Sequence, residues 1–105
     1  MKTQVVHNYD ELQDVIKMHS DVYCLLYKPE SELSECAAER LEKAAETGEN
    51  GILCHVDVTQ VRDIHPKYNI TVAPTLLVFK NGKQNNQIKG CNDASFYENL
   101  MKGSY

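Results

Sequence analysis

The pattern of apolar and polar positions predicts a central sheet. Residues 21–27 (DVYCLLY) and 52–58 (ILCHVDV) are apolar at nearly every position, which is typical of strands that a sheet buries on both faces. Residues 3–7 (TQVVH) predict a further, shorter strand.

A β-hairpin is expected in the second half of the chain. The apolar run 72–79 (VAPTLLVF) and the polar run 83–89 (KQNNQIK) flank Asn81-Gly82, a dipeptide that strongly favours a two-residue hairpin turn. Because the second arm is almost wholly polar, it is predicted to form an edge strand.

The segments between these strands are predicted to form helices. The apolar positions that recur at helical spacing predict helices over residues 9–19 and from the stretch PESELSEC (29–36) onward, the second closed by Gly48. A short helix interrupted by proline is expected over 59–68, and a final helix after Asn92 or Asp93. The order predicts one α/β domain over residues 1–105, with a parallel part linked by crossovers and then an antiparallel hairpin.

Charge and composition narrow the class of protein. The formal net charge is −4, so no general attraction to nucleic acid or to anionic membranes is expected. The amino-terminal segment has no apolar core of a secretory signal, and the apolar runs are too short to span a bilayer. A cytoplasmic location is therefore predicted.

The cysteines show no motif spacing. The four of them, Cys24, Cys36, Cys54 and Cys91, include no pair three residues apart. In a reducing compartment this favours four free thiols. Cys54 and His55 are neighbours, but adjacent strand positions point to opposite faces, so we predict neither a metal site nor a cofactor.

Residues 66–90 carry a resemblance to a known family. The stretch PKYNITVAPTLLVFKNGK, followed by IKG, resembles the thioredoxin family from its third helix to its last strand. The resemblance implies a thioredoxin-like fold, with a central mixed five-stranded sheet flanked by helices on both faces. It also implies that Ala73-Pro74-Thr75 holds a cis proline that faces the active site.

The family's W-C-G-P-C motif is altered here. The two motif cysteines correspond to Ser31 and Ser34, and the preceding tryptophan to Glu30. A buried Asp and a Lys thought to assist proton transfer in the family correspond to Leu25 and His55. Because a serine hydroxyl cannot form a disulfide, these changes predict a protein that is not a dithiol–disulfide oxidoreductase and has no catalytic residue at these positions.

The preferred hypothesis is a redox-inactive binding module. The resemblance implies a groove formed by Glu30, Ala73, Pro74 and Cys91, in which a protein or peptide partner pairs backbone to backbone as an added strand.

Two alternatives stay open. One is an enzyme of cell redox homeostasis, performing single-thiol exchange or glutathione-linked chemistry through Cys91 or Cys36. Cys91 is favoured because it lies in a turn before a helix, whereas Cys36 lies on an apolar helix face. The other is a structural subunit whose partner supplies the chemistry.

Overall fold

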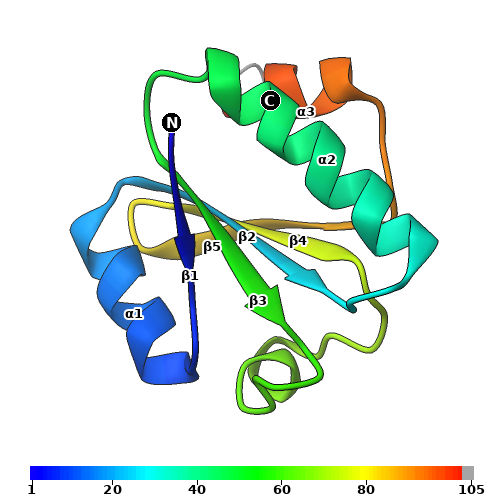
Figure 1. Ribbon diagram of the computed structural model, residues 1–105. Coiled ribbons are helices and arrows are strands. Elements are labelled where there is room, and N and C mark those ends of the chain that lie inside the picture. The colour runs from blue at the N-terminus through cyan, green and yellow to red at the C-terminus, as the bar shows by residue number, and fades with distance from the viewer. Residues whose placement is uncertain (103–105) are drawn as a thin grey trace.

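Five strands form one mixed sheet in the order β1-β3-β2-β4-β5 (Figure 1). The computed structural model describes residues 1–102. β1, β3 and β2 are parallel, β4 is antiparallel to β2, and β5 is antiparallel to β4. The strands are β1 (Lys2–Val5), β2 (Asp21–Tyr27), β3 (Ile52–Asp57), β4 (Thr75–Lys80) and β5 (Lys83–Lys89).

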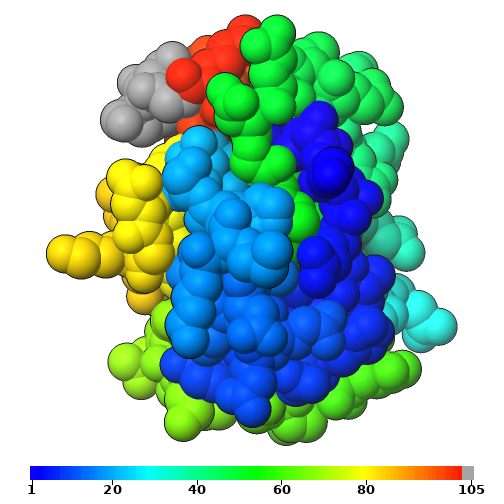
Figure 2. Space-filling model, turned by 90° about the vertical axis from the view of Figure 1, so that its left-hand side faces the viewer, coloured from blue at the N-terminus to red at the C-terminus, as the bar shows by residue number. Residues whose placement is uncertain are grey.

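Helices cover both faces of the sheet (Figure 1). α2 (Glu32–Thr47) and α3 (Ala94–Met101) lie on one face, while α1 (Tyr9–Met18) and the 3₁₀ helix η1 (His65–Tyr68) lie on the other. Figure 2 shows α1 from outside, spread over its face of the molecule, with the β4–β5 hairpin projecting beside it. The predicted fold class is confirmed. Within residues 1–102, no helix is long and apolar enough to cross a membrane.

The sheet divides the core into two clusters. Alternate strand residues point to opposite faces, so Cys24 and Cys54 pack against α1 while Tyr23 and Leu25 pack against α2 and α3. The near-continuous apolar runs of β2 and β3 follow from this burial on both faces.

The hairpin turn has the predicted geometry. Asn81 and Gly82 both have positive φ, 52° and 83°, as the two central residues of a type I′ hairpin turn require. β5 lies at the edge of the sheet, next to β4 alone, and its first four residues and its last residue are exposed. Its polar composition is therefore explained by solvent on its free edge.

Two predicted details differ in the structure. Gly48 is the C-cap of α2 with φ −77°, and not a left-handed residue after the helix. The amino-terminal ammonium of Met1 donates to the carbonyl oxygens of Ala45 and Gly48, which satisfies helix-end acceptors without a left-handed cap. Of the helix expected over 59–68, only His65–Tyr68 is helical, with Pro66 at its start.

Candidate functional site

The two serines at the mouth of α2 have structural partners. Ser31 is the N-cap, and its Oγ accepts the backbone N–H of Ser34 at 3.3 Å. The Ser34 side chain is buried, and its Oγ accepts the backbone N–H of Lys28 at 3.0 Å. Both hydroxyls therefore hold the β2–α2 connection in place.

The proline loop and the turn after β5 lie next to each other. The Ala73–Pro74 peptide bond is cis. The N–H of Gly90 donates to the carbonyl oxygen of Pro74 at 3.0 Å, and Cys91 follows directly. Of the four residues predicted to form the groove, Pro74 accepts this hydrogen bond, and Ala73 and Cys91 are the chain neighbours of its two partners. Glu30 lies exposed before α2 with φ 69°.

Cys36 and Cys91 form a disulfide. Their Cα atoms are 5.8 Å apart, although 55 positions separate them in the sequence. Both residues are half-buried. The expectation of four free thiols is wrong, because the packing of α2 beside the β5–α3 turn brings together two cysteines that are far apart in the chain.

The turn that carries Cys91 is held by a buried tyrosine. The Tyr97 hydroxyl accepts the backbone N–H of Asn92 at 3.1 Å and donates to the carbonyl oxygen of Gly90 at 3.3 Å. Tyr97 is only 1% exposed, so this clamp is shielded from water. It fixes the backbone on both sides of Cys91.

Arg40 ties α2 to the same turn. Its Nη1 donates to the carbonyl oxygen of Asn92 at 3.1 Å and lies 3.7 Å from the carboxylate of Asp93. A cavity of about 350 Å³ opens beside the disulfide, and its wall consists of Cys36, Glu39, Arg40, Lys43 and Ala94. Arg40 was not singled out from the sequence. Its position four residues after Cys36 on a predicted helix indicates that the two side chains are neighbours on the helix surface.

The remaining two cysteines are buried and reduced. Cys24 and Cys54 are direct partners in the β2–β3 register and are both 0% exposed. Burial raises the pKa of the Cys54 thiol to about 12, and burial, with a smaller effect of Cys54, raises the pKa of Cys24 well above its usual value. Neither thiol forms a nucleophilic thiolate near neutral pH.

Leu25 and His55 face each other across β2 and β3. Leu25 is buried and His55 is partly buried, with its Nε2 3.9 Å from the carboxylate of Glu42 on α2. Burial lowers the pKa of His55, and Glu42 opposes that shift. The positions that the resemblance assigned to a proton relay are therefore neighbours in space, but they hold no carboxylate.

Comparison with known proteins identifies the family. The thioredoxin family profile matches residues 6–102, and the chain belongs to the thioredoxin family. It is 32% identical over 89 residues to a thioredoxin of Echinococcus granulosus, covering 85% of this chain and 83% of that protein. It is also 26% identical over 103 residues to thioredoxin-1 of Caenorhabditis elegans, covering 96% of this chain and 90% of that one.

Solved structures agree on the fold. A mutant thioredoxin of Halobacterium salinarum NRC-1 superposes with a TM-score of 0.89 at 22% identity, over 97% of this chain and 89% of that one. Plasmodium falciparum thioredoxin superposes with a TM-score of 0.85 at 24% identity, over 97% and 99% of the two chains.

The hypothesis of a redox-inactive binding module is wrong. The curated relatives are thioredoxins, and two of the four cysteines are joined in a disulfide. The error came from equating the loss of the motif cysteines, at Ser31 and Ser34, with the loss of a disulfide. The alternative that assigned thiol chemistry to Cys91 or Cys36 agrees better with these findings.

Proposed function

We propose that this chain is a thiol–disulfide oxidoreductase that cycles the Cys36–Cys91 pair between disulfide and dithiol. The observation that carries the proposal is the disulfide itself, which joins α2 to the turn hydrogen-bonded to Pro74. The cytoplasmic location predicted from the sequence remains a prediction. In a reducing compartment, a disulfide at the surface of this fold would be a transient, catalytic one.

Accessibility distinguishes the two sulfurs. Cys36 lines the cavity whose wall also includes Ala94 at the start of α3, whereas Cys91 packs against the core cluster to which α2 and α3 contribute. We assign Cys36 as the thiol that attacks substrate and Cys91 as the resolving thiol, because the attacking sulfur must reach a substrate sulfur directly.

Two cations support a thiolate at Cys36. Arg40 and Lys43 lie four and seven residues further along α2, on the same face of the helix, and both line the cavity with Cys36. Positive charge beside a cysteine lowers the pKa of its thiol. Glu39 opposes this effect, and Asp93 takes part of the charge of Arg40.

The exchange balances without a bound cofactor. In the reduced protein, the Cys36 thiolate attacks a substrate disulfide, forms a mixed disulfide and releases one substrate thiolate, which takes up a proton. Cys91 then loses its proton, and its thiolate attacks the Cys36 sulfur, forms the Cys36–Cys91 bond and releases the second substrate thiolate, which takes up a proton. The substrate gains two electrons, the pair loses two, and an external dithiol reduces the pair again.

A protein or peptide disulfide is the proposed substrate. The groove residues Ala73, Pro74 and Cys91 adjoin one another, and an extended segment laid beside the proline loop would pair with its backbone. Glu30 lies on the approach to α2 and would contact the same segment.

Turnover with matched cysteine variants tests the proposal. The wild type should reduce insulin with dithiothreitol as the external dithiol. Cys36→Ser should abolish turnover, and Cys91→Ser should accumulate a mixed disulfide that mass spectrometry detects. Cys54→Ala, which changes a buried and unreactive thiol, is the control and should retain turnover. If Cys36→Ser turned over insulin as fast as the wild type, the assignment would be refuted. It would also be refuted if excess dithiothreitol left the Cys36–Cys91 bond intact.

A further inference from the structure

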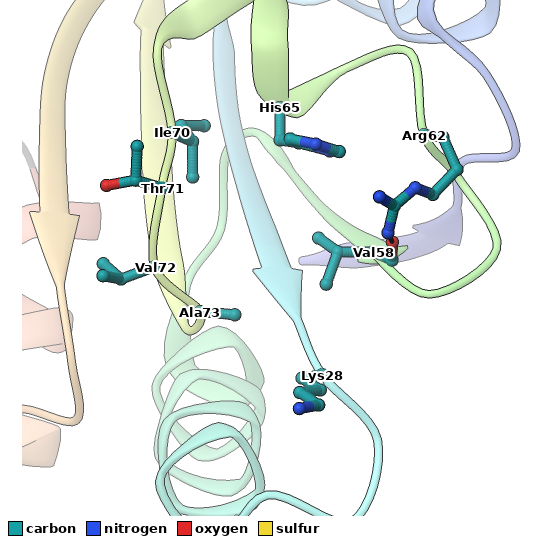
Figure 3. A pocket seen from close by; sticks show the side chains of 8 residues that line it. All are labelled: Lys28, Val58, Arg62, His65, Ile70, Thr71, Val72 and Ala73. Atoms are coloured by element: carbon teal, nitrogen blue, oxygen red, sulfur yellow. Dashed lines mark hydrogen bonds between the residues drawn. The ribbon is translucent and has the colours of Figure 1, made fainter.

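A cavity of about 340 Å³ lies beside the loop before β4, and Ala73, the residue before Pro74, forms part of its wall. Figure 3 shows its two walls: the segment from Ile70 to Ala73 on one side, and Val58, Arg62 and His65 on the other, with Lys28 at one end. The walls come from the residue after β2, the connection from the end of β3 to the start of η1, and the loop before β4.

The polar groups of this cavity carry positive charge without a counter-charge. Among the described residues no Asp or Glu lines it, although the chain as a whole has a net charge of −4. Within residues 1–102, neither the Lys28 ammonium nor the Arg62 guanidinium forms an ion pair. Arg62 donates one N–H to the carbonyl oxygen of Val58 at 3.3 Å, which holds it against the wall and leaves further donors for a ligand.

His65 adds a second, independent observation. Its Nδ1 is buried and has no hydrogen-bond partner among the described residues. Unsatisfied buried polar atoms are rare in native proteins, and each one calls for an explanation such as a bound water, an ion, local strain or a functional role. Here the atom belongs to a ring that forms the wall of the cavity beside Arg62 (Figure 3).

The opposite wall offers free backbone groups. The N–H groups of Thr71, Val72 and Ala73 donate no hydrogen bond within the described part of the chain. Val72 is 47% exposed, so the segment presents both backbone donors and an apolar side chain. An extended peptide can pair with such a segment and place alternate side chains in flanking pockets.

The cavity lies within the reach of a short peptide from the disulfide. Ala73 lines it, Pro74 is hydrogen-bonded to Gly90, and Cys91 follows. The Cα path from Ala73 to Cys91 through this bond is about 12 Å, which an extended chain covers in about four residues.

We propose that the pocket formed by Lys28, Arg62 and His65 selects substrate segments that carry an acidic side chain about three or four residues from the reacting cysteine. Selection among substrates rests on the proposed exchange at Cys36–Cys91. Binding of an acidic peptide in this pocket does not require that exchange. The substrate carboxylate accepts charge-assisted hydrogen bonds from Arg62 and Lys28 while its backbone lies along residues 71–73.

Binding of a peptide without cysteine tests this pocket apart from redox activity. The probe is an eight-residue peptide with one glutamate, serine in place of cysteine and an uncharged coumarin label, and its matched control replaces glutamate by glutamine. By fluorescence anisotropy at low salt, the glutamate peptide should bind about fivefold more tightly, as one partly exposed ion pair allows. Arg62→Gln should remove that preference. Lys83→Gln, the same charge change at the distant hairpin, should preserve it.

Three outcomes would overturn the proposal. The first is equal affinity of the two peptides, and the second is an equal effect of Arg62→Gln and Lys83→Gln. The third is displacement of the peptide by S-methylglutathione at concentrations near the peptide's own Kd, which would assign the pocket to a glutathione-like compound. A fivefold preference in a protein that fails to reduce insulin would uphold the selection of acidic segments by this pocket and refute only the redox proposal.

Discussion

The backbone N–H of Gly90 donates a hydrogen bond of 3.0 Å to the carbonyl oxygen of Pro74. It extends the β4–β5 pairing one residue beyond Thr75 and Lys89. Because Cys91 follows Gly90 and Ala73 precedes Pro74, the disulfide and the cavity lined by Lys28, Arg62 and His65 adjoin the same short segment. A substrate bound along the proline loop would therefore approach both.

The two hydrogen bonds of the Tyr97 hydroxyl should hold the turn that carries Cys91 in position. Tyr97→Phe removes the hydroxyl that accepts from Asn92 and donates to Gly90, and leaves a backbone N–H without its partner. We expect a loss of about 1–2 kcal/mol in the free energy of unfolding, measured with urea. The Cys36–Cys91 bond should also become easier to reduce, because the two sulfurs are held together less firmly.

Tyr27→Phe is the matched control for this change. Tyr27 packs against the same core, and its hydroxyl has no hydrogen-bond partner among the described residues. Its removal should leave both measurements nearly unchanged. Equal losses in the two variants would mean that Tyr97 contributes only its ring.

Arg40 is expected to tune the reactivity of Cys36. Arg40→Gln removes the positive charge four residues along α2 and the ion pair with Asp93. In the reduced protein, the Cys36 thiol pKa should rise, and iodoacetamide labelling of Cys36 at pH 7 should slow about two- to fivefold. Lys17→Gln on α1 makes the same charge change on the opposite face of the sheet and should leave the rate unaltered. A faster rate in Arg40→Gln would contradict the assigned role.

The helices and strands could be predicted from the sequence more completely than the candidate site, because turns depend on neighbouring residues whereas the site depends on tertiary packing. Local signals such as Asn81-Gly82 specify their turn through neighbouring residues alone, and the hairpin formed as expected. The Cys36–Cys91 pair depends on how α2 packs beside the turn after β5, which no spacing within either segment encodes. The same holds for the cavity, since Lys28 follows β2 whereas Arg62 and His65 lie in the connection between β3 and β4.

The serines at the mouth of α2 should matter for stability. Ser34→Ala removes a buried acceptor of the Lys28 N–H and should cost about 1–3 kcal/mol, of which the helix propensity of alanine returns about 0.5 kcal/mol. Ser31→Ala removes the N-cap and should cost about 1 kcal/mol. Urea unfolding measures both, with the exposed Ser20→Ala as control. A neutral Ser34→Ala would show that another group satisfies the Lys28 N–H.

His55 should make stability depend on pH. Burial lowers its pKa in the folded protein, and Glu42 at 3.9 Å only partly opposes this. The unfolded chain takes up a proton near pH 6.5, whereas the folded chain does so only at lower pH. The contribution of neutral His55 is therefore complete above pH 6.5 and is lost as the pH falls through the folded pKa.

Urea unfolding of the wild type and of His55→Asn, from pH 7.5 to 4.5, checks this expectation. The difference in the free energy of unfolding between wild type and variant should decrease on acidification, because only the wild type has the buried imidazole to protonate. Glu42→Gln removes the carboxylate that favours the charged ring, so the loss of stability with falling pH should be steeper in that variant than in the wild type. If the wild type instead gained stability relative to His55→Asn as the pH fell, the attraction to Glu42 would outweigh burial.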